Sequence, residues 1–203
     1  MVRRALKTST FLIVPAMVAF ACCAPSLVPA LLGPQWEGAV PFLQVYCLVY
    51  ALLPIHTTNL QALNGMGRSD LFLRLELIKK AYGVASVLFC AFVLGDVNLL
   101  VASYLVTGVV STLVNAWPNK RVIGYSYLEQ VHDIAPAFLL AGIASIPAIA
   151  ISMLGLGAWA TVLLQVLAFA SVYLGLSALL RIEELSYLVS TARDLLRGRR
   201  TGK

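Results

Sequence analysis

The sequence predicts an all-α, polytopic membrane protein, a bundle of about six transmembrane helices with both ends of the chain on the cytoplasmic side. Three observations predict this fold class. Of the 203 residues, 60% are apolar and 12% are charged, whereas a soluble domain carries about 25% charged residues. The apolar residues are grouped in stretches long enough to cross a bilayer. The Lys and Arg residues fall between alternate stretches, as the positive-inside bias of membrane proteins requires.

Six apolar stretches follow one another along the chain with short connections between them. A spanning helix needs about 20 mainly apolar residues, and the third stretch is the one that falls short. It continues back through Leu71–Lys79 as a helix that can emerge at the interface. An apolar soluble bundle is disfavoured because the segments lack polar faces. The stretches are Ser9–Leu32, Val40–Leu63, Lys80–Leu94, Val97–Trp117, Ile134–Leu154 and Ala158–Leu180.

Prolines punctuate the first two stretches. Pro15, Pro25 and Pro29 fall in the first stretch, and Pro41 and Pro54 fall in the second. Each proline inside a helix removes a backbone hydrogen bond and favours a kink. Membrane helices tolerate this where a neighbouring group satisfies the freed carbonyl. We therefore expect the first two helices to be bent.

The basic residues determine the orientation. Of the 15, all but Lys80 precede the first stretch, follow the sixth, or lie between the second and third or the fourth and fifth stretches, and Lys80 begins the third stretch on the same side. The alternate connections contain Glu37 and Asp96 and no basic residue. An even number of helices with both ends inside fits this pattern. The same pattern predicts no Lys or Arg deep in any helix and no carboxylate in the bundle interior.

The chain divides into two parts, residues 1–181 as the six-helix bundle and residues 182–203 as a cytoplasmic amphipathic helix with a basic tail. Ile182, Leu185 and Leu188 recur at the spacing of one helix face, which is typical of a helix lying on a membrane surface. Basic residues near the headgroups gain about 1 kcal/mol each from anionic lipid. The net charge of +6 therefore requires no nucleic acid as a partner.

The sequence contains no motif that indicates an enzyme, a cofactor or a metal site. The four cysteines lie inside apolar stretches and form no metal-like spacing with His56 or His132. No nucleotide-binding glycine loop, paired-carboxylate motif or nucleophile elbow is present. A membrane-embedded enzyme would need a reactive pair at one boundary, for which His132 beside Asp133 is the single candidate.

Polar side chains concentrate in and just after the second stretch. Gln44, His56 and Asn59 lie within one span, where polar groups are expensive and usually face the bundle interior or a water-filled path. They are our candidates for cavity contacts, with hydrogen bonding between helices as the alternative interpretation. Arg68 and Arg74 follow at the inner mouth, where a guanidinium can bind phosphate through two hydrogen bonds. Their alternative role is simply to set the topology.

Three short runs carry a family resemblance. They read LLGPQW at 31–36, AVPFLQ at 39–44 and LNGMGRSD at 63–70. Together they resemble the polysaccharide flippases of the MOP superfamily, most closely the O-antigen, colanic-acid and teichuronic-acid type exporters. In that family a Leu-Leu-Gly-x-x-Trp loop follows one helix, and an Ala-Leu-Gly-Arg turn ends the next. This chain departs slightly from that turn, with an extra glycine between 64 and 68.

The resemblance implies that the chain is the C-terminal six-helix lobe of a two-lobe flippase. Such a protein moves a polyprenyl-diphosphate-linked oligosaccharide outward across the bacterial cytoplasmic (inner) membrane by alternating access. The implied partners are the lipid-linked oligosaccharide, anionic lipid, and a second six-helix lobe or further copies of the chain. The alternative is a non-transporting accessory or structural membrane subunit, or an inactive fragment.

Overall fold

The computed structural model of the chain describes residues 1–95, 97–122 and 124–198. Within those ranges the chain forms helices joined by short turns, and no strand occurs. Five helical segments in the described part are long and apolar enough to cross a membrane: Val2–Leu32, Pro34–Gly65, Leu99–Ala116, Tyr127–Ser152 and Ala158–Leu179. These findings confirm the predicted fold class, and the chain is a multi-pass membrane protein.

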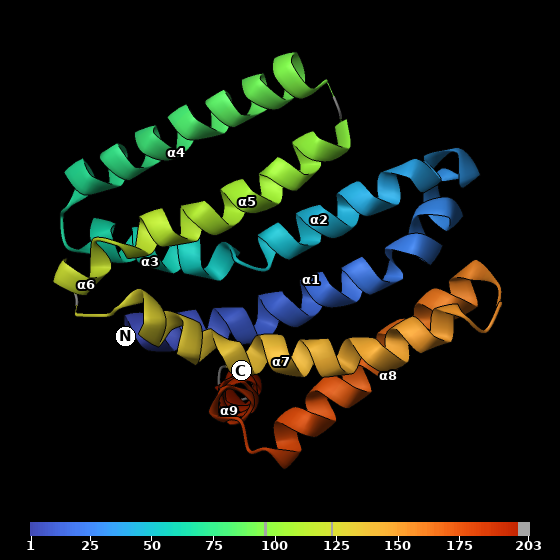
Figure 1. Ribbon diagram of the computed structural model, residues 1–203. Helices are drawn as coiled ribbons and strands as arrows, with labels where there is room; N and C mark the ends of the chain where they lie inside the picture. The colour runs from blue at the N-terminus through green and yellow to red at the C-terminus, as the bar shows by residue number, and fades with distance from the viewer. Residues whose placement is uncertain (96, 123, 199–203) are drawn as a thin grey trace.

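The long helices α1 to α8 run back and forth through the bundle, and α9 lies across them, seen end-on in Figure 1. The N-terminus, α9, the α3–α4 turn and α6 lie toward one end of the bundle, which we call the inner end. The α1–α2, α4–α5 and α7–α8 connections lie at the other end. The elements are α1 (Val2–Leu32), η1 (Pro34–Ala39), α2 (Val40–Tyr50), α3 (Leu53–Gly65), α4 (Ser69–Phe89), η2 (Cys90–Leu94), α5 (Val97–Ala116), α6 (Asn119–Val122), α7 (Tyr127–Ser152), α8 (Ala158–Leu179) and α9 (Glu183–Gly198).

The sixth long helix of the bundle is α4, and it differs from the other five in composition. It continues from Ser69 through the π-helical turn Cys90–Leu94, so the third predicted stretch does extend back through 71–79 as expected. Its first half carries Arg74, Glu76, Lys79 and Lys80. This charge is the reason that α4 does not share the apolar character of the other five segments.

Helix α1 remains one helix although it contains three prolines. Pro15 has no N–H to donate to the carbonyl of Phe11, four residues earlier. The phenol of Tyr173 in α8 donates to that carbonyl instead, at 3.0 Å. The same ring packs on Phe11, with ring centroids 5.2 Å apart. Tyr173 therefore replaces the hydrogen bond that Pro15 removes and joins α8 to α1.

The second predicted helix is divided into two. Helix α2 ends at Tyr50 and α3 begins at Leu53, with Pro54 in its first turn. Inside a continuous helix the ring of Pro54 would clash with the carbonyl of Tyr50, so the helix ends there. The bend predicted for this segment is thus confirmed as a break, whereas α1 is not interrupted.

The hydrophobic core lies among α1, α7 and α8. Its buried members include Phe11, Phe169 and Tyr173, together with small residues of α7 such as Ala141 and Ala144. Small residues let the helices approach closely in a membrane. By contrast, no side chain of α4 is buried, and α4 packs mainly on α5. The bundle therefore consists of a packed frame, helix α5 packed on α2 and α3, and helix α4 attached mainly through α5.

Charged side chains join α1, α7 and α9 at the inner end. Arg3 bonds both carboxylate oxygens of Asp133, at 2.7 and 2.6 Å, and the phenol of Tyr125 donates to the same carboxylate at 2.7 Å. Burial and this hydrogen bond raise the pKa of Tyr125. Lys7 lies 3.6 Å from Glu184 of α9. Asp133 thus serves as a link between helices, which leaves the predicted reactive pair with His132 without support.

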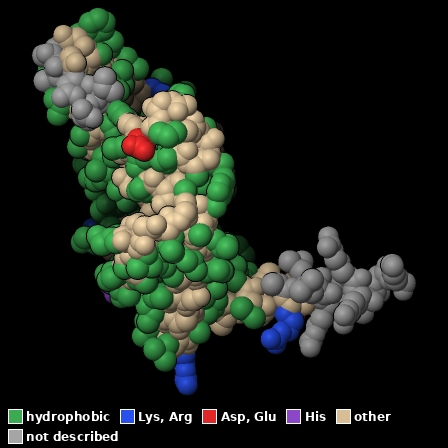
Figure 2. Space-filling view, turned by 90° about the vertical axis from the view of Figure 1, so that its right-hand side faces the viewer, with side chains coloured by type: hydrophobic (Ala, Val, Ile, Leu, Met, Phe, Trp, Pro, Cys, Tyr) green, Lys and Arg blue, Asp and Glu red, His purple; other side chains and the backbone are tan. Residues whose placement is uncertain are grey.

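The opposite end of the bundle has a different surface. Figure 2 shows mainly hydrophobic and neutral side chains there, with an acidic side chain in view and Lys or Arg only at the margins. The η1 connection at this end contains Glu37. The structure therefore places the basic N-terminal segment and α9 together on one side, as the predicted topology requires.

We predict that Tyr173→Phe lowers the free energy of unfolding by about 1 kcal/mol, because a buried carbonyl loses its donor. In a Pro15→Ala background the restored N–H of residue 15 can bond the Phe11 carbonyl, so the same change should cost much less. Thermal unfolding of the four proteins in detergent gives this double-mutant cycle. Equal costs in the two backgrounds would show that Tyr173 does not compensate for Pro15.

Candidate functional site

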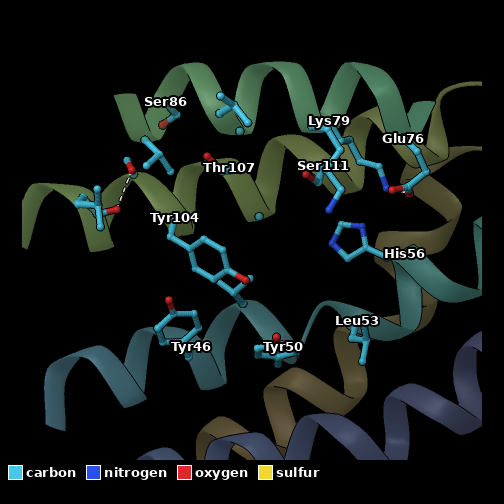
Figure 3. A pocket seen from close by; sticks show the side chains of 18 of the residues that line it. Tyr46, Tyr50, Leu53, His56, Glu76, Lys79, Ser86, Tyr104, Thr107 and Ser111 are labelled. Carbon is cyan, nitrogen blue, oxygen red and sulfur yellow. Dashed lines mark hydrogen bonds and ion pairs between the residues drawn. The ribbon is translucent and has the colours of Figure 1, made fainter. Parts of the chain in front are cut away.

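A groove of about 790 Å³ lies between the α2–α3 segment on one side and the α4–α5 hairpin on the other. We call it the central groove. Its lining is mainly apolar but includes hydroxyl, imidazole and charged groups, contributed by all four helices. Figure 3 shows Tyr46, Tyr50 and Tyr104 in one part of the groove and His56 in another.

The inner half of the central groove carries charge. Glu76 and Lys79 form an ion pair one turn apart on α4, and His56 of α3 faces them across the groove (Figure 3). The imidazole Nδ1 of His56 lies 2.9 Å from the amide nitrogen of Asn115, which fixes the orientation of the ring. Lys79 is the eleventh residue of α4, about three turns from its start.

This ion pair corrects two expectations from the sequence. No Lys or Arg was expected deep in a helix, and no carboxylate in the interior, because the helix over 71–79 was expected to emerge at the membrane interface. The structure instead places Lys79 and Glu76 on a helix that faces the groove. A paired charge tolerates this position because each partner offsets the cost of removing the other from water.

The outer half of the central groove is aromatic. The rings of Tyr46 in α2 and Tyr104 in α5 are tilted against each other with centroids 4.8 Å apart. Tyr50 lies one helical turn from Tyr46 on the same wall. Tyr82 of α4 does not line the groove; its phenol donates to the carbonyl of Thr107 at 2.8 Å and contacts the hydroxyl of Ser111, which joins α4 to α5. Tyrosine offers an apolar ring and a polar tip, so this part of the groove can contact sugar rings.

A close approach of two helices sets the width of the groove. A Cβ atom added to Gly108 of α5 would lie 2.9 Å from Cγ1 of Val49 in α2. Glycine at 108 therefore allows α5 to pack directly on α2. Gly83, which faces the groove from α4, has no atom within 4 Å of such a Cβ. The α2–α5 wall is thus closely packed, whereas the α4 wall is open.

Of the predicted site residues, His56 lies in the central groove and Gln44 does not line it. The amide of Gln44 donates to the carbonyl of Ala21 at 3.1 Å. That carbonyl is the one freed by Pro25, which has no N–H to donate to it. Gln44 therefore compensates for Pro25 in the way that Tyr173 compensates for Pro15. Gln44 therefore forms a hydrogen bond between helices, which was the alternative interpretation of its role.

The same alternative describes Asn59, which is 1% exposed. Its amide donates to Gln130 of α7 at 2.8 Å and accepts from Asn119 of α6 at 2.5 Å. Gln130 in turn donates to the backbone carbonyl of Tyr125 at 3.4 Å. These amides join α3, α6 and α7 near the inner end. Asn59 lies outside the lining of the central groove.

Arg68 and Arg74 line a second groove of about 830 Å³, between the start of α4 and the end of α5. We call it the hairpin groove. It shares no lining residue with the central groove in the described part of the chain. An Nε–Oδ1 contact of 3.3 Å pairs Arg68 with Asp70, and this guanidinium lowers the pKa of the Asp70 carboxyl. The structure therefore separates the two arginines from His56.

The sequence analysis missed Glu76, Lys79 and the three tyrosines of the central groove. A periodic signal for them is present, because Glu76 and Lys79 are three residues apart and Tyr46 and Tyr50 are four apart, which places each pair on one helix face. If α4 lies in the membrane over its whole length, this spacing predicts that Glu76 and Lys79 face the bundle together.

Comparison with known proteins gives two matches. Residues 1–41 match a family described as polysaccharide biosynthesis protein. Over 140 residues the chain is 26% identical to the teichuronic acid biosynthesis protein TuaB of Bacillus subtilis (strain 168). The alignment covers 68% of this chain and 29% of the length of TuaB. Both matches support a polysaccharide-flippase type of family. No solved structure matches the chain.

We predict that Gly108→Ala lowers the free energy of unfolding by about 1–3 kcal/mol, the usual cost of overpacking. Val49 is β-branched and held in one rotamer on a helix, so it has little freedom to move aside. The matched control Gly83→Ala should be neutral or stabilising by up to about 1 kcal/mol, because alanine favours the helix. Thermal unfolding in detergent measures both variants, and equal effects would contradict the close packing at 108.

Asn59→Ala should lower the free energy of unfolding by about 2 kcal/mol, since it leaves Oε1 of Gln130 without its donor and Nδ2 of Asn119 without its acceptor in a buried site. Gln61→Ala, on an exposed position of the same helix, should change it by less than about 0.5 kcal/mol. Chemical unfolding followed by circular dichroism compares the two. A stable Asn59→Ala protein would return Asn59 to the list of candidate cavity contacts.

Proposed function

We propose that this chain takes part in the export of a polysaccharide, by moving a polyprenyl-diphosphate-linked oligosaccharide across the bacterial cytoplasmic (inner) membrane by alternating access. The carrying observation is the central groove, which combines the Lys79–Glu76 ion pair with three tyrosines between apolar helices. The two matches to polysaccharide biosynthesis proteins support the same role.

Each part of the groove suits one part of this substrate. The ammonium of Lys79 can exchange Glu76 for a diphosphate, because both partners are anionic oxygen ligands and an ion pair is readily exchanged where water enters. In the unloaded groove, Glu76 keeps Lys79 paired. The rings of Tyr46 and Tyr104 offer apolar faces to sugars, and their hydroxyls with that of Ser111 offer hydrogen bonds to sugar hydroxyls.

We propose that the chain works as one lobe of a larger or paired transporter. The TuaB alignment spans 29% of that protein. The central groove is open, and no side chain of α4 is buried, so a second lobe or a second copy can complete the walls. Alternating access would then consist of the α4–α5 hairpin and the partner lobe moving about the packed α1–α7–α8 frame.

We predict that Lys79→Gln lowers polysaccharide export by about thirtyfold or more, because loss of the cation that pairs with a bound diphosphate costs about 2 kcal/mol or more. Lys79→Arg keeps the charge and should retain part of the activity. Lys120→Gln, an exposed cation of α6 outside both grooves, is the control. The measurement is the distribution of lipid-linked oligosaccharide between the two leaflets in the complete assembly.

Export by Lys79→Gln at the control rate, with normal protein levels in the membrane, would contradict a transport role for the central groove. A separate experiment, deletion of the chain, tests the accessory-subunit alternative. If the chain is an accessory subunit, its deletion would lower the amount of another transporter in the membrane. The lipid-linked oligosaccharide moved by each remaining transporter would stay the same.

A further inference from the structure

The hairpin groove combines two arginines with an apolar wall. Arg68 and Arg74 line it together with Leu75, Ile78, Val114 and Trp117. Arg74 forms no ion pair with any residue that the structure describes. Arg68 contacts Asp70 through Nε alone, so its terminal nitrogens remain available. The groove therefore presents guanidinium donors beside a mainly apolar surface, which carries no hydroxyl among the described residues.

The order of these groups along the helices fits the boundary of a membrane. Arg68 precedes the first residue of α4 and Trp117 follows the last residue of α5, so both lie at the inner end of the bundle. Trp117 is 77% exposed, and tryptophan is enriched where headgroups meet hydrocarbon. Leu75, Ile78 and Val114 lie further from that end. Arg68 thus lies at the boundary, and Arg74, about 9 Å further along α4, lies where the apolar wall begins.

We propose that the hairpin groove binds the headgroup phosphate of an anionic glycerophospholipid of the inner leaflet. Arg68 and Arg74 bind the phosphate, and one acyl chain lies along Leu75, Ile78 and Val114. Charge complementarity carries the assignment, since basic pockets between membrane helices on this side bind anionic headgroups. Guanidinium also matches phosphate with two parallel hydrogen bonds.

The chemistry of the lining decides between a phospholipid and the lipid carrier of the transported glycan. A carrier loaded with sugars needs hydroxyls near its phosphates, and tyrosine, serine and threonine supply them in the central groove, whereas no hydroxyl lines the hairpin groove among the described residues. The bound phospholipid would supply apolar contacts to α4, which has no buried side chain. This proposal is independent of the transport role and holds for an accessory subunit as well.

Trp117 provides the probe. The chain contains three tryptophans, and Trp36 and Trp159 lie near the α1–α2 and α7–α8 connections, at the opposite end from Trp117. The full chain with W36F and W159F therefore reports on the hairpin groove alone. We would reconstitute it in phosphatidylcholine vesicles with phosphatidylglycerol, with bromine on the acyl chains of one lipid at a time. Bromine quenches tryptophan fluorescence on contact.

Brominated phosphatidylglycerol should quench Trp117 more strongly than brominated phosphatidylcholine at the same mole fraction. Two cations near the headgroups correspond to about thirtyfold in relative affinity, about fivefold for each arginine. R68Q with R74Q should abolish the preference, and R68K with R74K should keep most of it. Lys120 is a cation at the same end that does not line the groove. K120Q should therefore leave the preference for phosphatidylglycerol unchanged.

Equal quenching by the two lipids would overturn the proposal, as would a preference that persists in R68Q with R74Q. Unlabelled undecaprenyl phosphate that displaces brominated phosphatidylglycerol better than unlabelled phosphatidylglycerol does would assign the groove to the glycan carrier instead. If the W36F and W159F variant does not fold, native mass spectrometry of the chain with all three tryptophans provides the test. Retained phosphatidylglycerol should then decrease in R68Q with R74Q and not in K120Q.

Discussion

The backbone of a membrane helix has no water to bond, and this constraint governs how the bundle is assembled. Three prolines in α1 each remove one N–H donor. Tyr173 of α8 and Gln44 of α2 donate to the carbonyls that two of these prolines free. Two neighbours of α1 are therefore attached to it by hydrogen bonds that the prolines make necessary, and α1 stays a continuous helix at the centre of the packed frame.

The distribution of buried side chains divides the molecule into a frame and a hairpin. Helices α1, α7 and α8 share the main core. At the inner end, Asp133 of α7 binds Arg3 at the start of α1. The amide of Asn59 joins α3 to α7 and α6. Helix α4 contributes no buried side chain. Polar groups within the frame form hydrogen bonds that hold helices together. Polar groups that face the hairpin line a groove and can contact a ligand.

The two grooves beside the hairpin differ in the cation that they present. The central groove has Lys79, a compact charge already paired with Glu76, among hydroxyls and aromatic rings. The hairpin groove has two arginines above an apolar wall. A lysine on a flexible stem suits a charge that must be bound and released, and a planar guanidinium suits a phosphate that stays in place. The same helix, α4, supplies cations to both.

The sequence by itself determined the membrane-bundle class, the approximate spans and the grouping of basic residues on one side, because these depend on composition and order along the chain. It also indicated the polysaccharide-exporter resemblance through three short runs. The tertiary structure decided which polar side chains face a groove. Gln44 and Asn59 form hydrogen bonds with other helices, whereas Lys79 and Glu76, expected on a helix emerging at the interface, line the central groove. The physical reason is that spacing fixes which residues share a helix face, while only the packing of helices decides what that face meets.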